Sequence, residues 1–381
     1  MRMNEAHIMN TTTLHAAPEK THLKIGFVPL ADAAPLVAAK LLEFGHAHGL
    51  TLELSRQPSW AALRDKLLTG ELDAAHTLYG LAYGVQLGIG GPQQDMAVLM
   101  VLNRNGQAIT LSNRLADALA EHGALPRALA TLERKPVFAQ TFPTGTHAMW
   151  LNYWLAAQGV HPLRDIESVA IPPPQMVAAL TEERLDGFCA GEPWPALAQQ
   201  RGVGRTVIRS GEIWPDHPEK VLACRRDFVG RFPNTARALV QTMLEACRWL
   251  DGAGHRQEIA QWLARPDMLG VEPALIAEQL EGIGAFDPLR MKFFEDGAVN
   301  NPLESEGIWF MTQFERWGMM TRRDDYREIA RAVNQTALYR EAALAVGVSV
   351  PAAAGKPVFV DGRVWDGADA AAYVKGFGVR A

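Results

Sequence analysis

The residues best suited to chemistry form a turn that follows an apolar strand and opens a helix. This run, Thr141 to Trp154, reads TFPTGTHAMWLNYW. Backbone N–H groups are unpaired in the first turn of a helix, and the helix dipole is positive there. Gly145 lets the backbone approach closely, Thr144 or Thr146 can cap the helix, and His147 adds a switchable donor. The turn is therefore suited to capturing a small anion.

No catalytic set accompanies this turn. The glycine-rich segment 88–91 lacks the G-x-G-x-x-G register, and neither a G-x-S-x-G elbow nor an H-E-x-x-H motif occurs. The three cysteines, Cys189, Cys224 and Cys247, are an odd number without metal-ligand spacing, and we expect buried free thiols. We therefore expect a binding protein that is not an enzyme and that carries no metal or other cofactor.

Composition narrows the class of protein further. With 381 residues, 48% of them hydrophobic and 21% charged, the chain is expected to form two globular domains. A net charge of −5 argues against direct binding of nucleic acid. Residues 1–21 are polar and lack the apolar stretch of a signal peptide or a membrane span, so we expect a disordered tail, no membrane contact and a cytoplasmic location.

Strands and helices alternate along the chain, which predicts an α/β architecture with parallel, doubly wound sheets. Strands are expected at 23–28, 50–54, 72–77, 96–103, 108–111, 137–140, 169–171, 186–190 and 220–224, and helices at 35–45, 60–68, 147–158 and 175–183. The chain is mainly helical from Phe232 onward, with a small strand at 355–361. The strand at 220–224 is expected to return the chain to the first lobe. Two lobes joined by crossing strands leave a cleft between them, the usual place for a small ligand.

These expectations divide the chain into four parts. The expected parts are a tail at 1–21, a first lobe at 22–112 and 220–350, a second lobe at 113–219 and a C-terminal extension at 351–381.

Five segments together resemble the nitrate- and bicarbonate-binding proteins of ABC uptake systems. The segments are KIGFVPLADAAPLVAA, TFPTGTHAMWLNYWLAAQGV, IPPPQMVAAL, LDGFCAGEPW and HPEKVLACRRDFV. The resemblance covers about Leu23 to Val350, and the pairing of FCAGEPW with PPPQMVA is its specific part. It implies a two-lobe, periplasmic-binding-protein-like (type II) α/β fold that holds an oxyanion in the interlobe cleft.

Within this family the chain resembles the cytoplasmic nitrate/nitrite sensors of the NasS type. No export signal or lipobox cysteine stands near its start, and His76-Thr77-Leu78-Tyr79-Gly80 replaces an expected tryptophan-rich stretch. The resemblance implies an RNA-binding antiterminator as partner, released when nitrate or nitrite binds. Two alternatives stay open. One is the substrate-binding component of an ABC transporter for nitrate or bicarbonate. The other is an enzyme of similar fold, such as a pyrimidine-precursor synthase for thiamin, which needs a reactive histidine and cysteine in the cleft.

The resemblance also implies which residues bind the anion. Lys220 supplies the positive charge, His147 and Gln107 donate hydrogen bonds, and Gly145 and Thr146 belong to the helix start. On residue type alone, Lys220 would be a solvated lysine, His147 a helix-end histidine and Gln107 a turn cap.

Further positions are implied with smaller roles. Pro173 and Ala190 shape the pocket wall, and His76 and Thr77 are polar residues that line the cleft edge. Glu192 is expected to form hydrogen bonds between the lobes or to belong to a lid, because a carboxylate facing nitrate would repel it.

Overall fold

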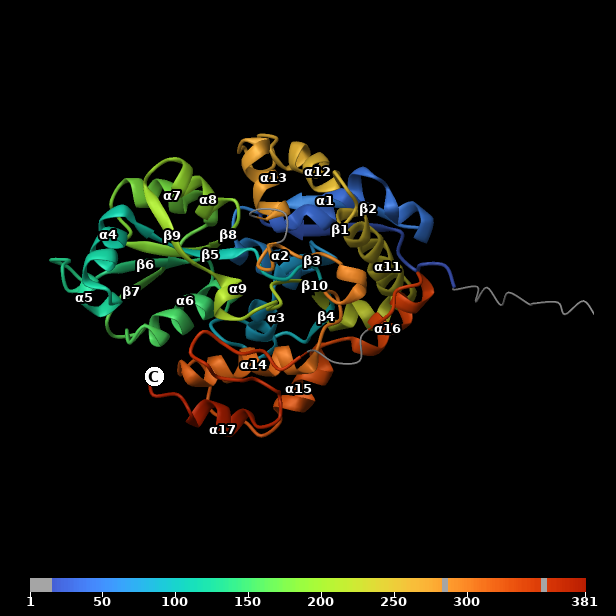
Figure 1. Ribbon diagram of the computed structural model, residues 1–381. Helices are drawn as coiled ribbons and strands as arrows, with labels where there is room; N and C mark the ends of the chain where they lie inside the picture. The colour runs from blue at the N-terminus through green and yellow to red at the C-terminus, as the bar shows by residue number, and fades with distance from the viewer. Residues whose placement is uncertain (1–15, 283–286, 351–354) are drawn as a thin grey trace, which may run out of the picture.

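Two five-stranded sheets organise the chain in the computed structural model, which describes residues 16–282, 287–350 and 355–381 (Figure 1). The first sheet has the order β2-β1-β3-β10-β4 and the second β7-β6-β8-β5-β9. The strands are β1 (His22–Phe27), β2 (Thr51–Arg56), β3 (Ala74–Leu78), β4 (Met96–Val101), β5 (Gln107–Ser112), β6 (Val137–Gln140), β7 (Glu167–Ala170), β8 (Gly187–Gly191), β9 (Gly204–Arg209) and β10 (Lys220–Arg225).

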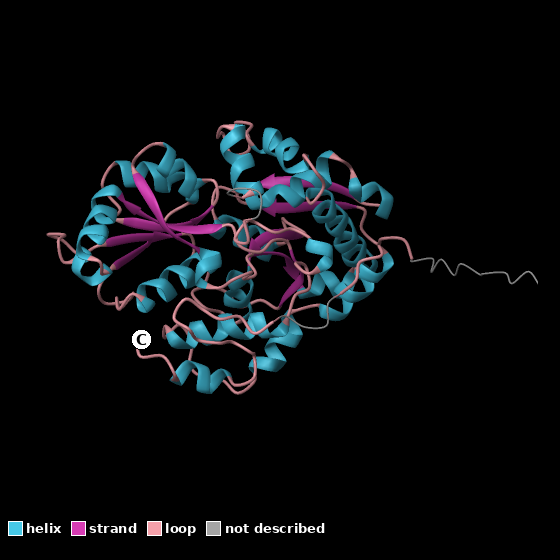
Figure 2. Ribbon diagram, in the orientation of Figure 1, coloured by secondary structure: helices cyan, strands magenta, loops and turns pink. Residues whose placement is uncertain are grey.

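Helices cover both sheets and add a further layer beneath them (Figure 2). Those in the chain's first part are η1 (Ala31–Ala33), α1 (Ala34–Leu41), η2 (Phe44–His48), α2 (Trp60–Thr69) and α3 (Tyr79–Gln86). The second lobe contains α4 (Asn113–His122), α5 (Leu125–Leu129), α6 (Thr146–Ala157), α7 (Pro173–Thr181), α8 (Trp194–Gln200) and α9 (Ser210–Ile213). The remainder are α10 (Arg226–Arg231), α11 (Pro233–Leu250), α12 (His255–Leu263), α13 (Pro273–Glu281), η3 (Glu295–Gly297), α14 (Glu304–Arg316), α15 (Tyr326–Val333), α16 (Thr336–Ala345) and α17 (Ala370–Lys375). Among the described residues, none of these helices combines the length and apolar character needed to cross a membrane.

The two-lobe α/β fold agrees with the sequence-based prediction, but the sheets are mixed instead of parallel. β1 runs parallel to β2 and β3, whereas β10 lies antiparallel between β3 and β4. In the second sheet, β5 lies antiparallel between β8 and β9. Each sheet therefore contains one strand whose chain arrives from the other lobe, and this strand runs antiparallel to both of its neighbours. The strand predicted to return the chain to the first lobe is β10.

The crossing point differs from the boundary expected after residue 112. β5 pairs with strands of the second sheet, so the chain leaves the first lobe between Val101 and Gln107. The hydrophobic pattern of the sequence could not show which sheet β5 joins, because an apolar strand has the same pattern in either sheet.

The two ends of the chain also depart from expectation. Within the predicted tail, 1–15 lies outside the described residues, but the Glu19 carboxylate accepts hydrogen bonds from the backbone N–H groups of Asn234 and Thr235 at the start of α11. The strand expected at 355–361 is reduced to one isolated bridge between Val358 and Val364.

The C-terminal segment 355–381 packs against both α14 and the second lobe. The Phe359 ring stacks on Trp309 of α14, with ring centroids 5.6 Å apart, and lies 5.1 Å from Tyr153 of α6. The backbone N–H of Val360 donates to the Ile213 carbonyl at 2.9 Å. This segment therefore ties together elements that are far apart in the sequence (Figure 1).

Phe359→Ala should lower the free energy of unfolding by about 3–5 kcal/mol, because it removes a buried ring from this aromatic cluster. Val358→Ala is the matched control, since Val358 is 55% exposed and Phe359 only 3%. Val358→Ala should change the free energy of unfolding by no more than about 0.5 kcal/mol. Urea unfolding measures both, and equal losses for the two variants would contradict the proposed role of the ring.

Candidate functional site

A fully buried polar cluster lies where the two sheets face each other. The first lobe contributes Lys220 at the start of β10, Asp32 in η1 and His76 in β3, and each side chain has no exposed surface. The second lobe contributes Gln107 at the start of β5 and His147 in the first turn of α6. Buried polar groups must find partners inside the protein, so their contacts define the chemistry of the cluster.

The ammonium of Lys220 is held between two carboxylates. Its Nζ lies 2.8 Å from Oδ2 of Asp32 and 2.9 Å from Oε1 of Glu219. Burial lowers the pKa of Lys220, but the two carboxylates outweigh burial and raise it above its usual value. Burial likewise opposes the charge of Asp32, but Lys220 and His76 together hold the pKa of Asp32 well below normal. Lys220 and Asp32 therefore stay ionised.

Glu219 places its carboxyl group at the beginning of α6. Its Oε1 accepts a hydrogen bond from Thr146 Oγ1, and its Oε2 accepts one from Trp150 Nε1 at 3.0 Å. Burial raises the pKa of Glu219, and the contacts with Lys220, Thr146 and Trp150 only partly offset this rise. The predicted anion seat at the helix start is thus occupied by a carboxyl group of the protein, and Glu219 binds a proton more readily than Asp32.

A chain of hydrogen bonds runs from His147 through Gln107 to Asp32 of the first lobe. Nε2 of His147 lies 2.5 Å from Oε1 of Gln107, and its Nδ1 lies 2.7 Å from Oγ1 of Thr141. The amide Nε2 of Gln107 donates to Asp32 Oδ2 at 3.3 Å. Burial, reinforced by Lys220, lowers the pKa of His147 well below its usual value, so the ring is neutral. A neutral ring with Nε2 donating to Gln107 and Nδ1 accepting from Thr141 satisfies every contact.

The structure brings five of the predicted site residues into this cluster: Lys220, His147, Gln107, Thr146 and His76. Nε2 of His76 lies 3.1 Å from Asp32 Oδ1. Thr77 is buried beside His76 in β3, and its Oγ1 has no hydrogen-bond partner among the described residues.

The remaining predicted residues have other surroundings. Gly145 is the N-cap of α6, and neither Thr144 nor Thr146 caps that helix. A Cβ atom at Gly145 would lie 2.6 Å from Cδ1 of Leu78, so the glycine permits close approach of the first lobe. Pro173 begins α7, and Ala190 lies opposite Ala108 in the second sheet. A role for these two residues in binding stays a prediction.

Glu192 lies between the lobes, as its position in the sequence predicts. Its backbone carbonyl accepts a hydrogen bond from the Ala31 N–H at 2.8 Å, and its carboxylate accepts one from the Ala196 N–H at 3.2 Å. Burial raises the pKa of Glu192 to about 7.

Sequence reasoning missed Asp32, Glu219 and Trp150. Repulsion between a carboxylate and nitrate was considered for Glu192 alone, and Asp32 and Glu219 were not considered, yet both share the Lys220 ammonium. Two signals pointed to them: Asp32 stands in the segment LADAAP just before a helix, and Glu219 directly precedes Lys220.

The charge of the cluster controls what it can bind. With Lys220, Asp32 and Glu219 ionised, the charges of these three groups sum to −1, which repels an anion. A proton on Glu219 brings the sum to zero and turns a pure acceptor into a donor. A small anion can then take the place of a carboxylate beside Lys220.

The cysteines are poorly suited to act as nucleophiles. Cys189, Cys224 and Cys247 are buried free thiols, and burial raises the pKa of each. Thiols of this kind form few thiolates and react slowly. In the described part of the chain, no group of three or more His, Cys, Asp or Glu side chains is arranged to hold a metal ion.

Comparison with known proteins identifies the relatives of this chain. The profile of the NMT1-like family matches residues 16–264. The nitrate/nitrite binding protein NrtA of Synechocystis sp. (strain PCC 6803) is 36% identical over 94% of this chain and 85% of its own. The crystal structure of the periplasmic nitrate-binding protein NrtA from Synechocystis PCC 6803 superimposes with a TM-score of 0.89, covering 96% of this chain and 100% of that one. The nitrate import ATP-binding protein NrtC of the same organism is 37% identical over 86% of this chain and 51% of its own.

These findings correct three expectations. The relative of known structure is a periplasmic nitrate-binding protein, which overturns the predicted cytoplasmic location and the predicted sensor function. NrtC is a nitrate import protein, and nothing in the comparisons supports an RNA-binding antiterminator as partner. The error came from residues 1–21, whose polar character was given more weight than the similarity along the rest of the chain.

Lys220→Met should destabilise the protein by about 3–5 kcal/mol at pH 7, because it leaves two buried carboxylates without their counter-charge. The loss should shrink at pH 5, where Glu219, with its raised pKa, takes up a proton. Lys24→Met is the control: Lys24 pairs at 3.6 Å with Glu53, whose side chain is 71% exposed, and should contribute less than about 1 kcal/mol. Urea unfolding at the two pH values measures these effects, and a pH-independent loss for Lys220→Met would contradict the charge assignment.

Proposed function

The chain belongs to the NMT1-like family, and from that premise we propose that it is the substrate-binding component of an ABC importer for nitrate or nitrite. The observation that carries the proposal is the buried Lys220 ammonium between the two lobes, with Gln107 and His147 beside it. A weakly hydrated anion gains most from a cation in a dry site, because charge-assisted hydrogen bonds are the strong ones.

Similarity supports the choice of ligand. NrtA of Synechocystis is named for nitrate and nitrite, and its similarity extends over 94% of this chain. The nitrate import protein NrtC supports a transport role. Non-catalytic binding accords with both relatives and with the raised pKa of the Cys189 thiol, which disfavours a reactive cysteine in this region.

Binding is expected to proceed by exchange of anions on Lys220. In the closed cluster the ammonium is occupied by Asp32 and Glu219, so nitrate must displace one of them when the lobes separate. Asp32 keeps its contacts with His76 and Gln107 and remains ionised. Glu219 is the group that gives way, because a protonated Glu219 no longer competes with nitrate and can itself donate to a nitrate oxygen.

Isothermal titration with nitrate, nitrite, bicarbonate and chloride tests the proposal. We expect nitrate and nitrite to bind at a single site and chloride not to bind, because planar oxyanions match the spaced donors of the cluster. His147→Gln should weaken nitrate binding about tenfold, since it removes one neutral hydrogen bond and disturbs Gln107. If the parent protein bound neither nitrate nor nitrite, the proposed function would be wrong. Selective bicarbonate binding would assign a different substrate.

Nitrate binding should tighten as the pH falls from 8 to 5. Nitrate next to Glu219 favours its protonated form, so binding takes up a proton, and proton uptake favours binding at lower pH. Glu219→Gln should bind nitrate about tenfold more tightly at pH 8, and its pH dependence should be nearly flat.

Glu192→Gln provides the control for this pH experiment. Burial raises the pKa of Glu192 to about 7, so it titrates in the same range, but its carboxylate contacts the start of α8 instead of Lys220. Glu192→Gln should therefore keep the pH dependence of the parent protein. If Glu192→Gln abolished that dependence and Glu219→Gln preserved it, the proton would belong to Glu192.

A further inference from the structure

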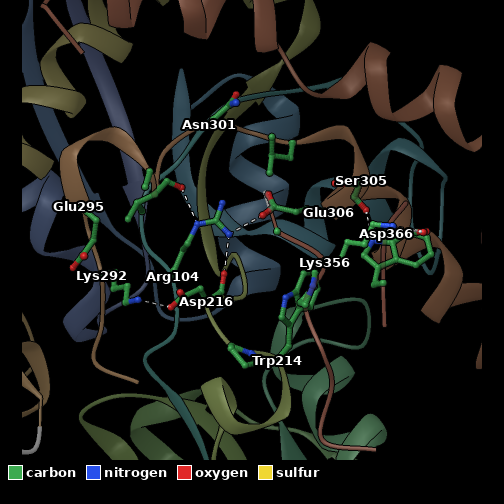
Figure 3. Close-up of a pocket in the computed structure, with 17 residues that line it drawn as sticks. Arg104, Trp214, Asp216, Lys292, Glu295, Asn301, Ser305, Glu306, Lys356 and Asp366 are labelled. Atoms are coloured by element: carbon green, nitrogen blue, oxygen red, sulfur yellow. Dashed lines mark hydrogen bonds and ion pairs between the residues drawn. The ribbon is translucent and has the colours of Figure 1, made fainter. Parts of the chain in front are cut away.

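A large cavity lies apart from the anion cluster. Its volume is about 520 Å³, within the range of small-molecule sites. It is enclosed by the second lobe at Trp214, by Arg104 on the crossing segment, by the loop leading to Asn301, by α14 at Glu306 and by the C-terminal segment at Trp365 (Figure 3). None of the five predicted residues that form the anion cluster contributes to its wall.

The charges of this cavity are balanced. Lys292 pairs with Asp216 at 2.7 Å, and Lys356 approaches Asp366 at 3.4 Å. Arg104 pairs with Glu306 at 2.7 Å, and the fourth carboxylate of the wall, Glu295, pairs at 2.6 Å with Arg290, which lies outside the lining. A lining with matched charges favours a ligand that has no net charge.

The Glu306 carboxylate is supported by Arg104 and by the backbone of Leu303, and Oε2 is its less well partnered oxygen. The side chain is 3% exposed, and Oε1 accepts from Nη1 of Arg104. Oε2 is buried and has no hydrogen-bond partner among the described residues. Leaving a buried acceptor unpaired is unfavourable, so this oxygen calls for a donor inside the cavity. Figure 3 shows the Glu306 carboxylate and the Arg104 guanidinium facing each other.

Arg104 offers the complementary group. Nε donates to the Val299 carbonyl at 3.1 Å, and Nη1 donates to Glu306 and to the Asp216 carbonyl at 2.8 Å. Within the described ranges no hydrogen bond uses Nη2. A free acceptor and a free donor therefore stand on neighbouring side chains, and a ligand that carries a cationic and an anionic group close together satisfies both.

The remaining walls suit a short side chain. Trp214 and Trp365 present apolar surface, and each is 3% exposed. Asn301 lines the cavity with its amide, and neither Nδ2 nor Oδ1 has a hydrogen-bond partner among the described residues. This amide provides a donor and an acceptor for a polar group.

We propose that this cavity is a second binding site, for a small zwitterion of the free α-amino-acid class. The ligand's ammonium group binds Glu306 Oε2, its carboxylate binds Arg104, and its side chain lies against the wall that contains Trp214 and Trp365. A simple anion would face the unpaired Glu306 oxygen, and a simple cation would face Arg104, so neither matches the site as well. This site is independent of the nitrate site and does not rest on the proposed transport function.

Isothermal titration and thermal-shift measurements on the full chain with the twenty free amino acids test this proposal. At least one amino acid is expected to bind at a single site and to raise the melting temperature, and saturating nitrate should not displace it. Glu306→Gln should weaken that binding at least tenfold, because a neutral amide replaces the partner of the ammonium group. Glu304→Gln is the matched control: it lies on the same helix and pairs instead with Arg331 at 3.6 Å.

Asn301→Leu provides a second variant, in case Glu306→Gln fails to fold without the partner of Arg104. Asn301→Leu removes two polar atoms that lack partners, so the protein should fold at least as stably while binding the amino acid several-fold more weakly. Nitrate affinity should remain unchanged. The proposal is overturned if the parent protein binds no free amino acid at millimolar concentration, if nitrate competes with it, or if neither variant weakens binding.

Discussion

The contact on which the rest of the structure depends is the buried ammonium of Lys220 between Asp32 and Glu219. A charge with no exposed surface is tolerated only if opposite charges and hydrogen bonds surround it. Asp32 comes from η1, Lys220 from the first strand to return from the second lobe, and Glu219 is bound by Thr146 and Trp150 of α6. The ammonium and its two carboxylates lie together at the first lobe, and the contacts of Glu219 with α6 and of Asp32 with Gln107 join them to the second lobe.

The same contact explains how a site with two carboxylates can serve an anion. Nitrate has only acceptors, and so has an ionised carboxylate, so the two groups compete for one ammonium. The competition is unequal, because Asp32 is supported by His76 and Gln107, whereas burial favours the protonated form of Glu219. Asp32 thus remains a counter-charge of Lys220, whereas Glu219 can lose its negative charge by taking up a proton. His147 contributes geometry instead of charge, since burial keeps its ring neutral.

Much of this architecture could be predicted from the sequence, but its decisive contacts could not. The alternation of apolar strands with helices predicts two α/β lobes, and the segment that opens α6 identifies His147 and Thr146 as members of the site. The hydrophobic pattern of β5 could not show that it belongs to the second sheet, because a strand buried on both faces has the same apolar pattern in either lobe. Asp32 and Glu219 were not among the predicted site residues, and the cation that they share becomes visible only in the folded chain. Long-range partners of this kind depend on tertiary packing, and residue types alone do not specify them.

The crossing segment between β4 and β5 contributes residues both to the anion cluster and to the cavity proposed to bind a zwitterion. The Leu102 N–H donates to the Lys220 carbonyl at 2.7 Å, and the Asn103 side chain accepts from the Lys220 N–H at 3.1 Å. The next residue, Arg104, forms the wall of the zwitterion cavity, and three residues later Gln107 enters the anion cluster. Hydrogen bonds to the backbone of Lys220 hold this short segment in place, so the same contacts that anchor it fix the position of Arg104 in one site and of Gln107 in the other.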